Sequence, residues 1–139
     1  MERVNEPRRG IRLVESDFPW LGAGSLALRE RAKEVLGARL EPYAELLPLE
    51  LDAPVWAVNV TKVVDALDEE RSEVLRFKTS NRIMDVKRYE FRKEVVEGLL
   101  IFKIPQLRRS TVFVSEEFVE LVEGAGLKGL AFRFLWESS

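Results

Sequence analysis

The chain contains no cysteine and no histidine among its 139 residues. Without cysteine, neither a disulfide framework nor a thiolate metal site can form. Without histidine, the chain lacks the commonest general base and the commonest ligand of transition metals. These two absences exclude the most familiar kinds of active site, and we therefore do not expect an enzyme.

Long apolar runs are also missing. No stretch approaches the roughly 20 apolar residues that cross a bilayer, and the N-terminal MERVNEPRRG lacks the apolar core of a signal peptide. We therefore expect a cytoplasmic protein with no membrane partner. The apolar fraction of 46% is that of an ordinary globular protein. The length predicts a single domain over residues 1–139, in which residues 1–10 form a loose N-terminal segment.

The clearest local signals lie in the C-terminal stretch, residues 111–135. It opens with β-branched and aromatic residues, which predict a strand. Ser115, followed by two glutamates, is typical of a helix N-cap. Apolar side chains then recur at helical spacing until Gly126, where a left-handed C-cap is expected. Gly129 permits a second turn, and alternating residues close the unit. We predict a strand–helix–strand unit whose two strands pair in parallel.

Weaker signals organise the first half of the chain. Ser25 is a candidate cap for a first helix, and Gly37 is its candidate stop. Pro48 should confine any strand around it to a sheet edge, because proline cannot donate a ladder hydrogen bond. The apolar run at residues 55–60 predicts a strand that is buried on both faces.

The middle of the chain predicts a short helix at residues 63–67, where apolar residues have the spacing of one helical turn. Residues 74–77 and 83–91 read as a hairpin, and residues 99–104 as a buried strand that ends at a proline. The fold class is therefore α+β, with a mixed or antiparallel sheet of about six to seven short strands and two or three helices.

Charge is separated along the sequence, although the net charge is only −2. Residues 41–73 carry nine acidic and two basic side chains, whereas residues 74–109 carry ten basic and four acidic ones. Such separation can mark partner surfaces, because complementary fields steer association. The alternative is that the two blocks interleave in the fold and cancel, and the sequence leaves both possibilities open.

Two groups of charged residues are candidate sites. Asp65, Asp68 and Glu69 could gather a hard cation such as Mg²⁺, but a solvated acidic turn is the commoner meaning of this pattern, and we predict no metal site and no cofactor. The second group is basic and interleaved with two aromatic residues, as in single-strand nucleic-acid platforms, although the same aromatics could serve the core. Its members are Arg82, Lys87, Arg88, Arg92 and Lys93, with Tyr89 and Phe91 between them.

Two ordered blocks of sequence resemble a known family. The first is Trp56-Ala57-Val58-Asn59-Val60, followed by Val64-Asp65-Ala66-Leu67-Asp68 and Glu70-Arg71-Ser72-Glu73. The second is Ile101-Phe102-Lys103-Ile104, followed by Val112-Phe113-Val114-Ser115 and Gly126-Leu127-Lys128-Gly129-Leu130-Ala131-Phe132. This order resembles the bacterial immunity proteins of polymorphic toxin systems, in the family numbered eleven in that series. The match covers roughly Pro54 to Leu135.

The resemblance implies a cytoplasmic, non-catalytic immunity protein that binds a cognate toxin, often a nuclease, and neutralises it by stoichiometric occlusion. Such families diverge at the toxin-facing surface, so the resemblance carries over no contact residue. The residues that match the motif positions are Asn59, Asp65, Leu67, Asp68 and Ser72. These residues could equally be structural, for example with Asp68 capping a turn.

Charge suggests where a toxin would bind. An inhibitor of a basic nuclease gains association rate and specificity from an acidic surface, and we therefore predict that Asp65, Asp68, Glu69 and Glu70 contact the toxin. The alternative is a nucleic-acid-binding regulatory module that uses the basic stretch 82–93. We expect a cognate toxin as the partner, rather than nucleic acid or a small-molecule substrate.

Overall fold

The structure is a computed structural model that describes residues 2–9, 16–19, 25–51 and 53–138. Within them it is an α+β fold, as the sequence predicts, but with nine strands where six or seven were expected. The elements in chain order are β1 (Arg3–Arg9), β2 (Leu26–Arg29), α1 (Glu30–Leu40), β3 (Ala44–Leu49), β4 (Val55–Val60), β5 (Glu73–Arg76), β6 (Ile83–Arg88), α2 (Lys93–Val96), β7 (Ile101–Phe102), the 3₁₀ turn η1 (Pro105–Leu107), β8 (Phe113–Ser115), α3 (Glu116–Gly124) and β9 (Leu130–Glu137).

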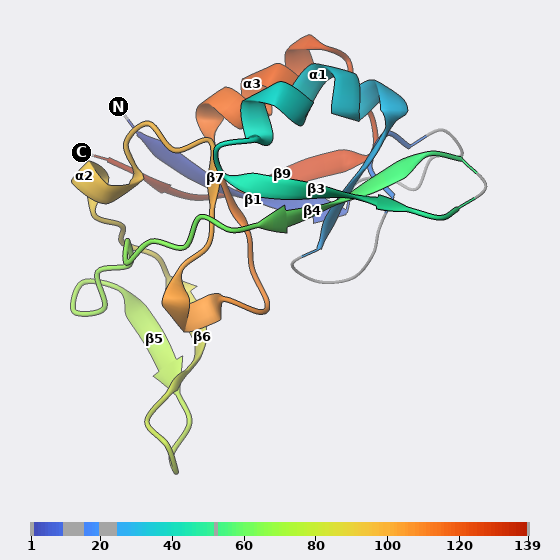
Figure 1. The fold of residues 1–139 in the computed structure, drawn as a ribbon. Coiled ribbons are helices and arrows are strands. Elements are labelled where there is room, and N and C mark those ends of the chain that lie inside the picture. Colours follow the sequence, from blue (N-terminus) through green and yellow to red (C-terminus); the bar gives the residue numbers. More distant parts are fainter. Residues whose placement is uncertain (1, 10–15, 20–24, 52, 139) are drawn as a thin grey trace.

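The strands form three antiparallel sheets. The largest has the order β7-β8-β1-β9, the second has the order β2-β4-β3, and β5 pairs with β6 alone. Helices α1 and α3 lie side by side on one face of the two larger sheets, and the β5–β6 hairpin projects on the opposite side (Figure 1). The two termini meet, because the Ser138 N–H donates to the Glu2 carbonyl at 2.8 Å.

The prediction of a loose N-terminal segment is wrong for Arg3–Arg9, which forms β1 between β8 and β9. Among residues 3–8 of this strand, Val4 and Asn5 alone are buried, so the sequence shows no apolar pattern there, and long-range backbone pairing holds the strand instead. Pro7 is tolerated because it lies beyond the pairing with β8, where β1 is paired on one side only.

The first helix begins later and ends later than the sequence predicts. Ser25 precedes β2 and does not cap a helix, while α1 begins at Glu30 after an Arg29 that makes no side-chain capping bond. Gly37 does not stop the helix but lies buried inside it. An added Cβ at Gly37 would meet the Leu46 side chain at 3.6 Å, an ordinary van der Waals distance, so the helix packs against β3 at this position.

The second sheet largely follows the prediction. Strand β4 has the expected bounds and is central, and β3, which contains Pro48, is an edge strand. Burial of β4 on both faces is wrong in part, because Asn59 is exposed while Val55, Val58 and Val60 are buried.

The short helix predicted at residues 63–67 is wrong. This segment is extended, with a parallel bridge from Val63 to Lys103 and an antiparallel bridge from Leu67 to Phe91. Apolar spacing of three or four residues also suits an irregular extended segment, and tertiary packing decides between the two. The hairpin prediction is confirmed, and Asn81 takes the left-handed conformation in its turn, at φ 61°.

The C-terminal unit has the predicted helix with the predicted ends. The Ser115 hydroxyl accepts from the Phe118 N–H at 3.4 Å, and Gly126 and Gly129 have φ angles of 67° and 97°. The predicted parallel pairing of the flanking strands is wrong, because β1 lies between β8 and β9 and is antiparallel to both.

The four-stranded sheet separates two apolar clusters. Val112 and Val114 face the helices, whereas Phe113 between them faces the other side, as the two-residue period of a strand requires. We call the second group the aromatic cluster, and its rings are those of Tyr89, Phe91, Phe102, Phe113 and Trp136. This cluster supports the candidate site.

Candidate functional site

The family-like motif around residue 68 forms a tight turn, which we call the acidic turn (Asp68–Ser72). The Asp68 carboxylate accepts from the Arg71 N–H at 3.1 Å, and the Asp68 carbonyl accepts from the Ser72 N–H at 2.9 Å. Asp68 therefore caps the turn, as the sequence suggested. Leu67 attaches the acidic turn to the core, because its side chain is completely buried in the aromatic cluster.

Ser72 and Glu90 lock the acidic turn to the end of β6. The Ser72 hydroxyl accepts from the Glu90 N–H at 2.9 Å and donates to the Glu90 carbonyl at 3.2 Å. The same carbonyl accepts from the Asp68 N–H at 2.8 Å. The Glu90 N–H and carbonyl have no partner in the described sheets, and these bonds satisfy them. The bonds therefore hold the turn in place without regular secondary structure.

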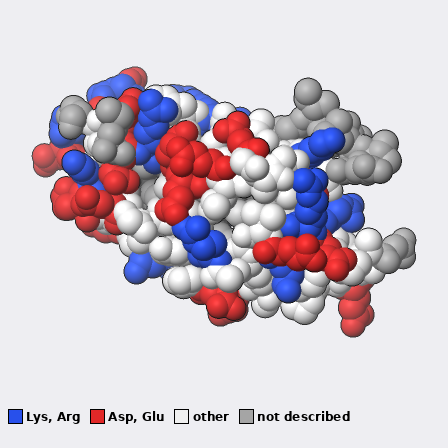
Figure 2. Space-filling view, turned by 90° about the horizontal axis from the view of Figure 1, so that it is seen from above, with Lys and Arg blue, Asp and Glu red and all other residues white. Residues whose placement is uncertain are grey.

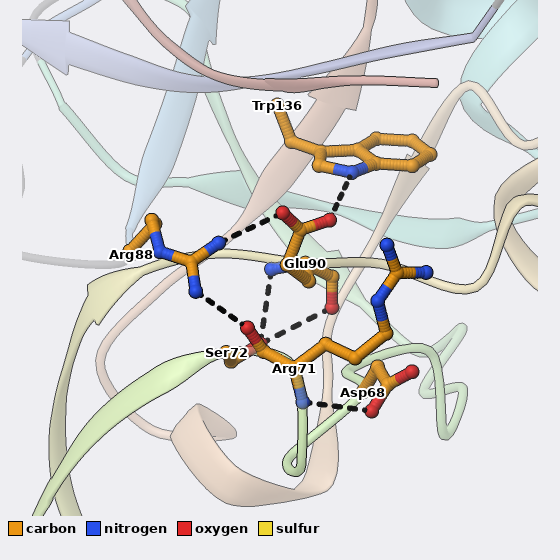
Figure 3. Close-up of polar contacts among 6 residues, drawn as sticks. All are labelled: Asp68, Arg71, Ser72, Arg88, Glu90 and Trp136. Carbon is orange, nitrogen blue, oxygen red and sulfur yellow. Dashed lines mark hydrogen bonds and ion pairs between the residues drawn. The ribbon is translucent and has the colours of Figure 1, made fainter. Parts of the chain in front are cut away.

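The Glu90 side chain extends this lock to the C-terminal strand. One carboxylate oxygen accepts from Arg88 Nη1 at 2.9 Å, and the other accepts from the indole N–H of Trp136 at 3.1 Å. Arg88 also donates to the Arg71 carbonyl at 2.8 Å. Figure 3 shows Arg88 and Trp136 converging on the Glu90 carboxylate, with the acidic turn beside them.

These groups border a hollow of about 390 Å³ between the acidic turn, the segment that enters α2, and the end of β9. Both acidic and basic side chains line it, and Trp136 and Phe91 supply its apolar part. The charged lining residues are Asp68, Arg71, Glu90, Arg92, Lys93, Glu94 and Glu137. We call this feature the charged hollow.

The four predicted toxin contacts differ in how far they are free to bind a partner. Asp65 is 74% exposed and pairs with Arg92 at 3.5 Å across the surface. Glu69 accepts from Gln106 Nε2 and from Arg76 Nη2, both at 2.8 Å. These bonds, first the one from Gln106 and then the one from Arg76, lower the pKa of the Glu69 carboxyl. Glu70 is exposed and has no ion-pair partner among the described residues.

The five residues of the basic group do not form one surface. Arg92 and Lys93 line the charged hollow and Arg88 borders it through Glu90, whereas Arg82 and Lys87 belong to the hairpin. Lys87 pairs with Asp85 at 3.3 Å. The structure therefore brings part of this group together with Asp68, which the sequence placed in a different site.

The two aromatic residues of the basic stretch belong to the core. Tyr89 and Phe91 are 8% and 5% exposed and stack on each other with ring centroids 5.5 Å apart. Burial raises the pKa of Tyr89 to about 12, because desolvation disfavours the phenolate. The nucleic-acid alternative consequently loses the stacking platform on which it depended and keeps only its basic side chains.

The acidic and basic blocks of the sequence interleave in the fold, at least around the acidic turn. Asp65 pairs with Arg92 and Glu69 pairs with Arg76, so each pair joins the two blocks. The helix face is likewise mixed: Figure 2 shows Lys/Arg and Asp/Glu side chains interspersed over it, and Arg39 of α1 pairs with Glu117 of α3. Local pairing thus replaces the broad acidic surface that the sequence allowed.

Sequence reasoning missed the residues at the centre of the site. Neither Glu90 nor Trp136 was among the candidate site residues that the sequence indicated. Their contact spans 46 positions of sequence, and no local pattern announces such a pair. The available signal was chemical, because a tryptophan N–H near a strand end requires an acceptor when it is buried.

The side chains of the site are suited to binding a partner. Among the described residues, no three acidic side chains gather in a way that could hold a metal ion. The Ser72 hydroxyl is engaged by Glu90 on both its donor and its acceptor side. Fixed charges of both signs beside an exposed turn suit the binding of a macromolecule with complementary charges. In the part of the chain that the structure describes, no helix is long and apolar enough to cross a membrane.

Comparison with known families agrees with a binding role. The sequence profile of the immunity protein family (Imm11) matches residues 50–135, which include the acidic turn and most of the charged hollow. The match covers more than half of the chain, and the chain belongs to this family. Membership indicates a role in immunity to a toxin and implies a toxin as binding partner. No curated protein matches the chain.

Proposed function

We propose that this chain is a non-catalytic immunity protein that neutralises a cognate toxin by stoichiometric occlusion, in the cytoplasm and within a polymorphic toxin system. The family match at residues 50–135 carries this proposal, because it spans the acidic turn and all of its described supports except Trp136. Immunity protein families are generally non-catalytic, and the rigid, charged surface beside the hollow supports binding as the means of inhibition.

The surface around the acidic turn is the proposed toxin-binding site. Of the four predicted contacts, Glu70 is the exposed carboxylate without an ion-pair partner in the described part of the chain, and Asp65, although it pairs with Arg92, keeps 74% of its side chain exposed. We assign direct toxin contact to these two residues. Asp68 and Glu69 position them, because one caps the turn and the other fixes it to Gln106 and Arg76.

A charge reversal tests this assignment. The probe is the cognate toxin domain, to be sought in the reading frame that neighbours this chain. Surface plasmon resonance measures its association with wild type and with Glu70→Arg. We expect association to slow about tenfold at low salt and the difference to shrink as salt screens the charges. The toxin's own activity, titrated with wild type, should disappear at one equivalent.

The matched control is Glu45→Arg. Glu45 belongs to the same acidic block and is exposed, but it lies on the edge strand β3. This variant should bind like wild type. Equal association rates for Glu70→Arg and wild type at every salt concentration would show that the toxin binds elsewhere. Continued loss of toxin activity, with no equivalence point in the titration, would show that the chain acts catalytically.

A further inference from the structure

The β5–β6 hairpin exposes more large apolar side chains than any other described element. Leu75, Phe77 and Met84 are 43%, 46% and 45% exposed, and they are half of the six large apolar residues that are exposed among the described ones. The hairpin also stands away from the rest of the molecule (Figure 1). Clustered apolar groups of this kind on a surface commonly mark an interaction site.

The hairpin is nevertheless firmly attached, so its apolar residues are not the sign of a loose segment. Val86 is 5% exposed and lies in the aromatic cluster, and Val74 and Ile83 pack against the same cluster. Arg76 ties the hairpin to the acidic turn through Glu69 and closes its end by donating to the Asn81 carbonyl at 3.0 Å. The inner face is therefore buried while the outer apolar groups stay exposed.

The end of the hairpin is also positively charged. Arg76, Lys87 and Arg88 are paired with Glu69, Asp85 and Glu90. Lys78 and Arg82 have no ion-pair partner among the described residues and lie on either side of the turn, next to Phe77. The exposed tip thus combines a phenylalanine and an arginine, residue types that are enriched at protein interfaces, with a second unpaired cation at Lys78.

We propose that the hairpin tip is a second contact element, which inserts Phe77 into an apolar groove with an acidic rim on the toxin. This inference rests on the proposed function and names the chemistry of the partner surface. The Glu69–Arg76 pair makes the tip continuous with the acidic turn, so one partner can engage both. A second copy of the chain would be a less favourable partner for the tip than the toxin, because a two-fold contact would bring two positively charged tips together.

The test compares two truncations of equally exposed apolar residues. Phe77→Ala should weaken binding of the neighbouring-frame toxin domain at least about 30-fold, mainly through faster dissociation. Leu47→Ala is the control, because Leu47 is 44% exposed but lies on β3. It should leave Kd within about twofold. Both side chains are exposed, so thermal unfolding should be nearly unchanged in both variants.

A second pair of variants tests whether the toxin groove has an acidic rim. Lys78→Glu with Arg82→Glu should slow association about tenfold at low salt, because the expected groove is acidic. The control is Lys128→Glu with Arg133→Glu, which reverses two exposed cations, one just before β9 and one within it. It should have little effect.

The outcomes separate the inference from the proposed function. If wild type binds the toxin domain and Phe77→Ala binds equally well, the tip is not a contact element and the inference is overturned, while the proposed function stands. If wild type fails to bind it, the proposed function falls and the inference with it. If toxin binding is unchanged but the tip variants lose self-association, binding to a DNA duplex or binding to anionic vesicles, the tip has that occupant and the proposal is wrong.

Discussion

The two faces of the four-stranded sheet are covered in different ways. One face carries α1 and α3, whose side chains pack with β-strand valines and leucines into the helix-side cluster. The other face carries the β5–β6 hairpin together with the acidic turn and η1, and the latter two contain little regular structure; all three pack on the aromatic cluster. Hydrogen bonds between side chains and backbone, above all those of Ser72 and Glu90, replace helical ones there.

Under the proposed function, this difference separates stability from recognition. The helix side is an ordinary amphipathic packing, and its surface mixes both charges with local pairs. The aromatic side holds an irregular chain rigid, so that it presents Glu70 and the hairpin tip without needing a helix or strand at those positions. Binding residues are commonly found on such loops above a rigid scaffold. We therefore expect substitutions on the two sides to have different consequences.

The largest expected effect compares one phenylalanine from each side. Phe113 and Phe118 are both 0% exposed, so Phe113→Ala and Phe118→Ala should each lower the free energy of unfolding by about 3–5 kcal/mol. Urea unfolding measures this loss. Only Phe113→Ala should also weaken toxin binding in conditions where both variants are folded, because Phe113 contacts Tyr89 and Phe91 beneath the site.

Equal losses of binding in the two variants would contradict this separation of the faces. Phe134→Ala is the control for the assay, since Phe134 is 55% exposed and its truncation should change the free energy of unfolding by less than about 1 kcal/mol.

The next effect concerns turns on the two sides. Gly129 has a φ angle of 97°, and an added Cβ would lie 2.0 Å from Ser16 Oγ, so Gly129→Ala should cost more than about 2 kcal/mol of stability. Gly98, beside α2, has a φ angle of 80° but open space around it, so Gly98→Ala should cost only about 1 kcal/mol. Thermal denaturation ranks the two, and a reversed order would mean that the tight approach at Ser16 relaxes without cost.

A smaller effect is expected at the lock between the acidic turn and β6. Ser72→Ala removes one acceptor and one donor for the Glu90 backbone, which should cost about 1–2 kcal/mol. Ser80→Ala, in the exposed hairpin turn, should stay within about 0.5 kcal/mol of wild type. Chemical denaturation compares them. If Ser72→Ala is as stable as the control, the bonds of Asp68 and the packing of Leu67 hold the turn without the Ser72 hydroxyl.

The smallest effect is a pH dependence at Glu69. Hydrogen bonds from Gln106 and Arg76 lower the pKa of this carboxyl below its ordinary value of 4.5. Its contribution to stability is therefore complete above pH 4.5 and is lost as the pH falls through the lowered pKa. Solvent screening at this 42% exposed side chain keeps the contribution well below 1 kcal/mol.

The measurement for Glu69 is the urea midpoint of wild type and Glu69→Gln between about pH 6 and pH 3. The variant should lose less stability on acidification than wild type. Parallel curves would show that the contacts from Gln106 and Arg76 do not persist in solution.

The sequence predicted the elements whose signals are local. Ser115 and Gly126 mark the ends of α3 through capping chemistry, and Pro48 marks an edge strand through its missing donor. These features depend on a few neighbouring residues, so periodicity and capping rules find them. The acidic turn around Asp68 was also placed correctly, although its carboxylates were not known to be paired.

The remainder depends on contacts that are distant in sequence. Strand β1 carries few apolar residues and is recognisable only through its pairing with β8 and β9. The charged hollow likewise exists because Trp136 reaches Glu90 and because β6 returns beside Ser72. The sequence of the basic stretch 82–93 indicated a stacking platform, but the structure places Tyr89 and Phe91 in the core. No pattern within a short window contains this information.

Hydrogen–deuterium exchange of the chain with and without the neighbouring-frame toxin domain tests most directly whether the two faces differ in function. We expect the toxin to slow exchange in the acidic turn and in the hairpin residues 77–82, with α1 and α3 unchanged. Protection confined to α1 and α3, with the acidic turn and the hairpin exchanging as in the free chain, would contradict the assignment of recognition to the aromatic side.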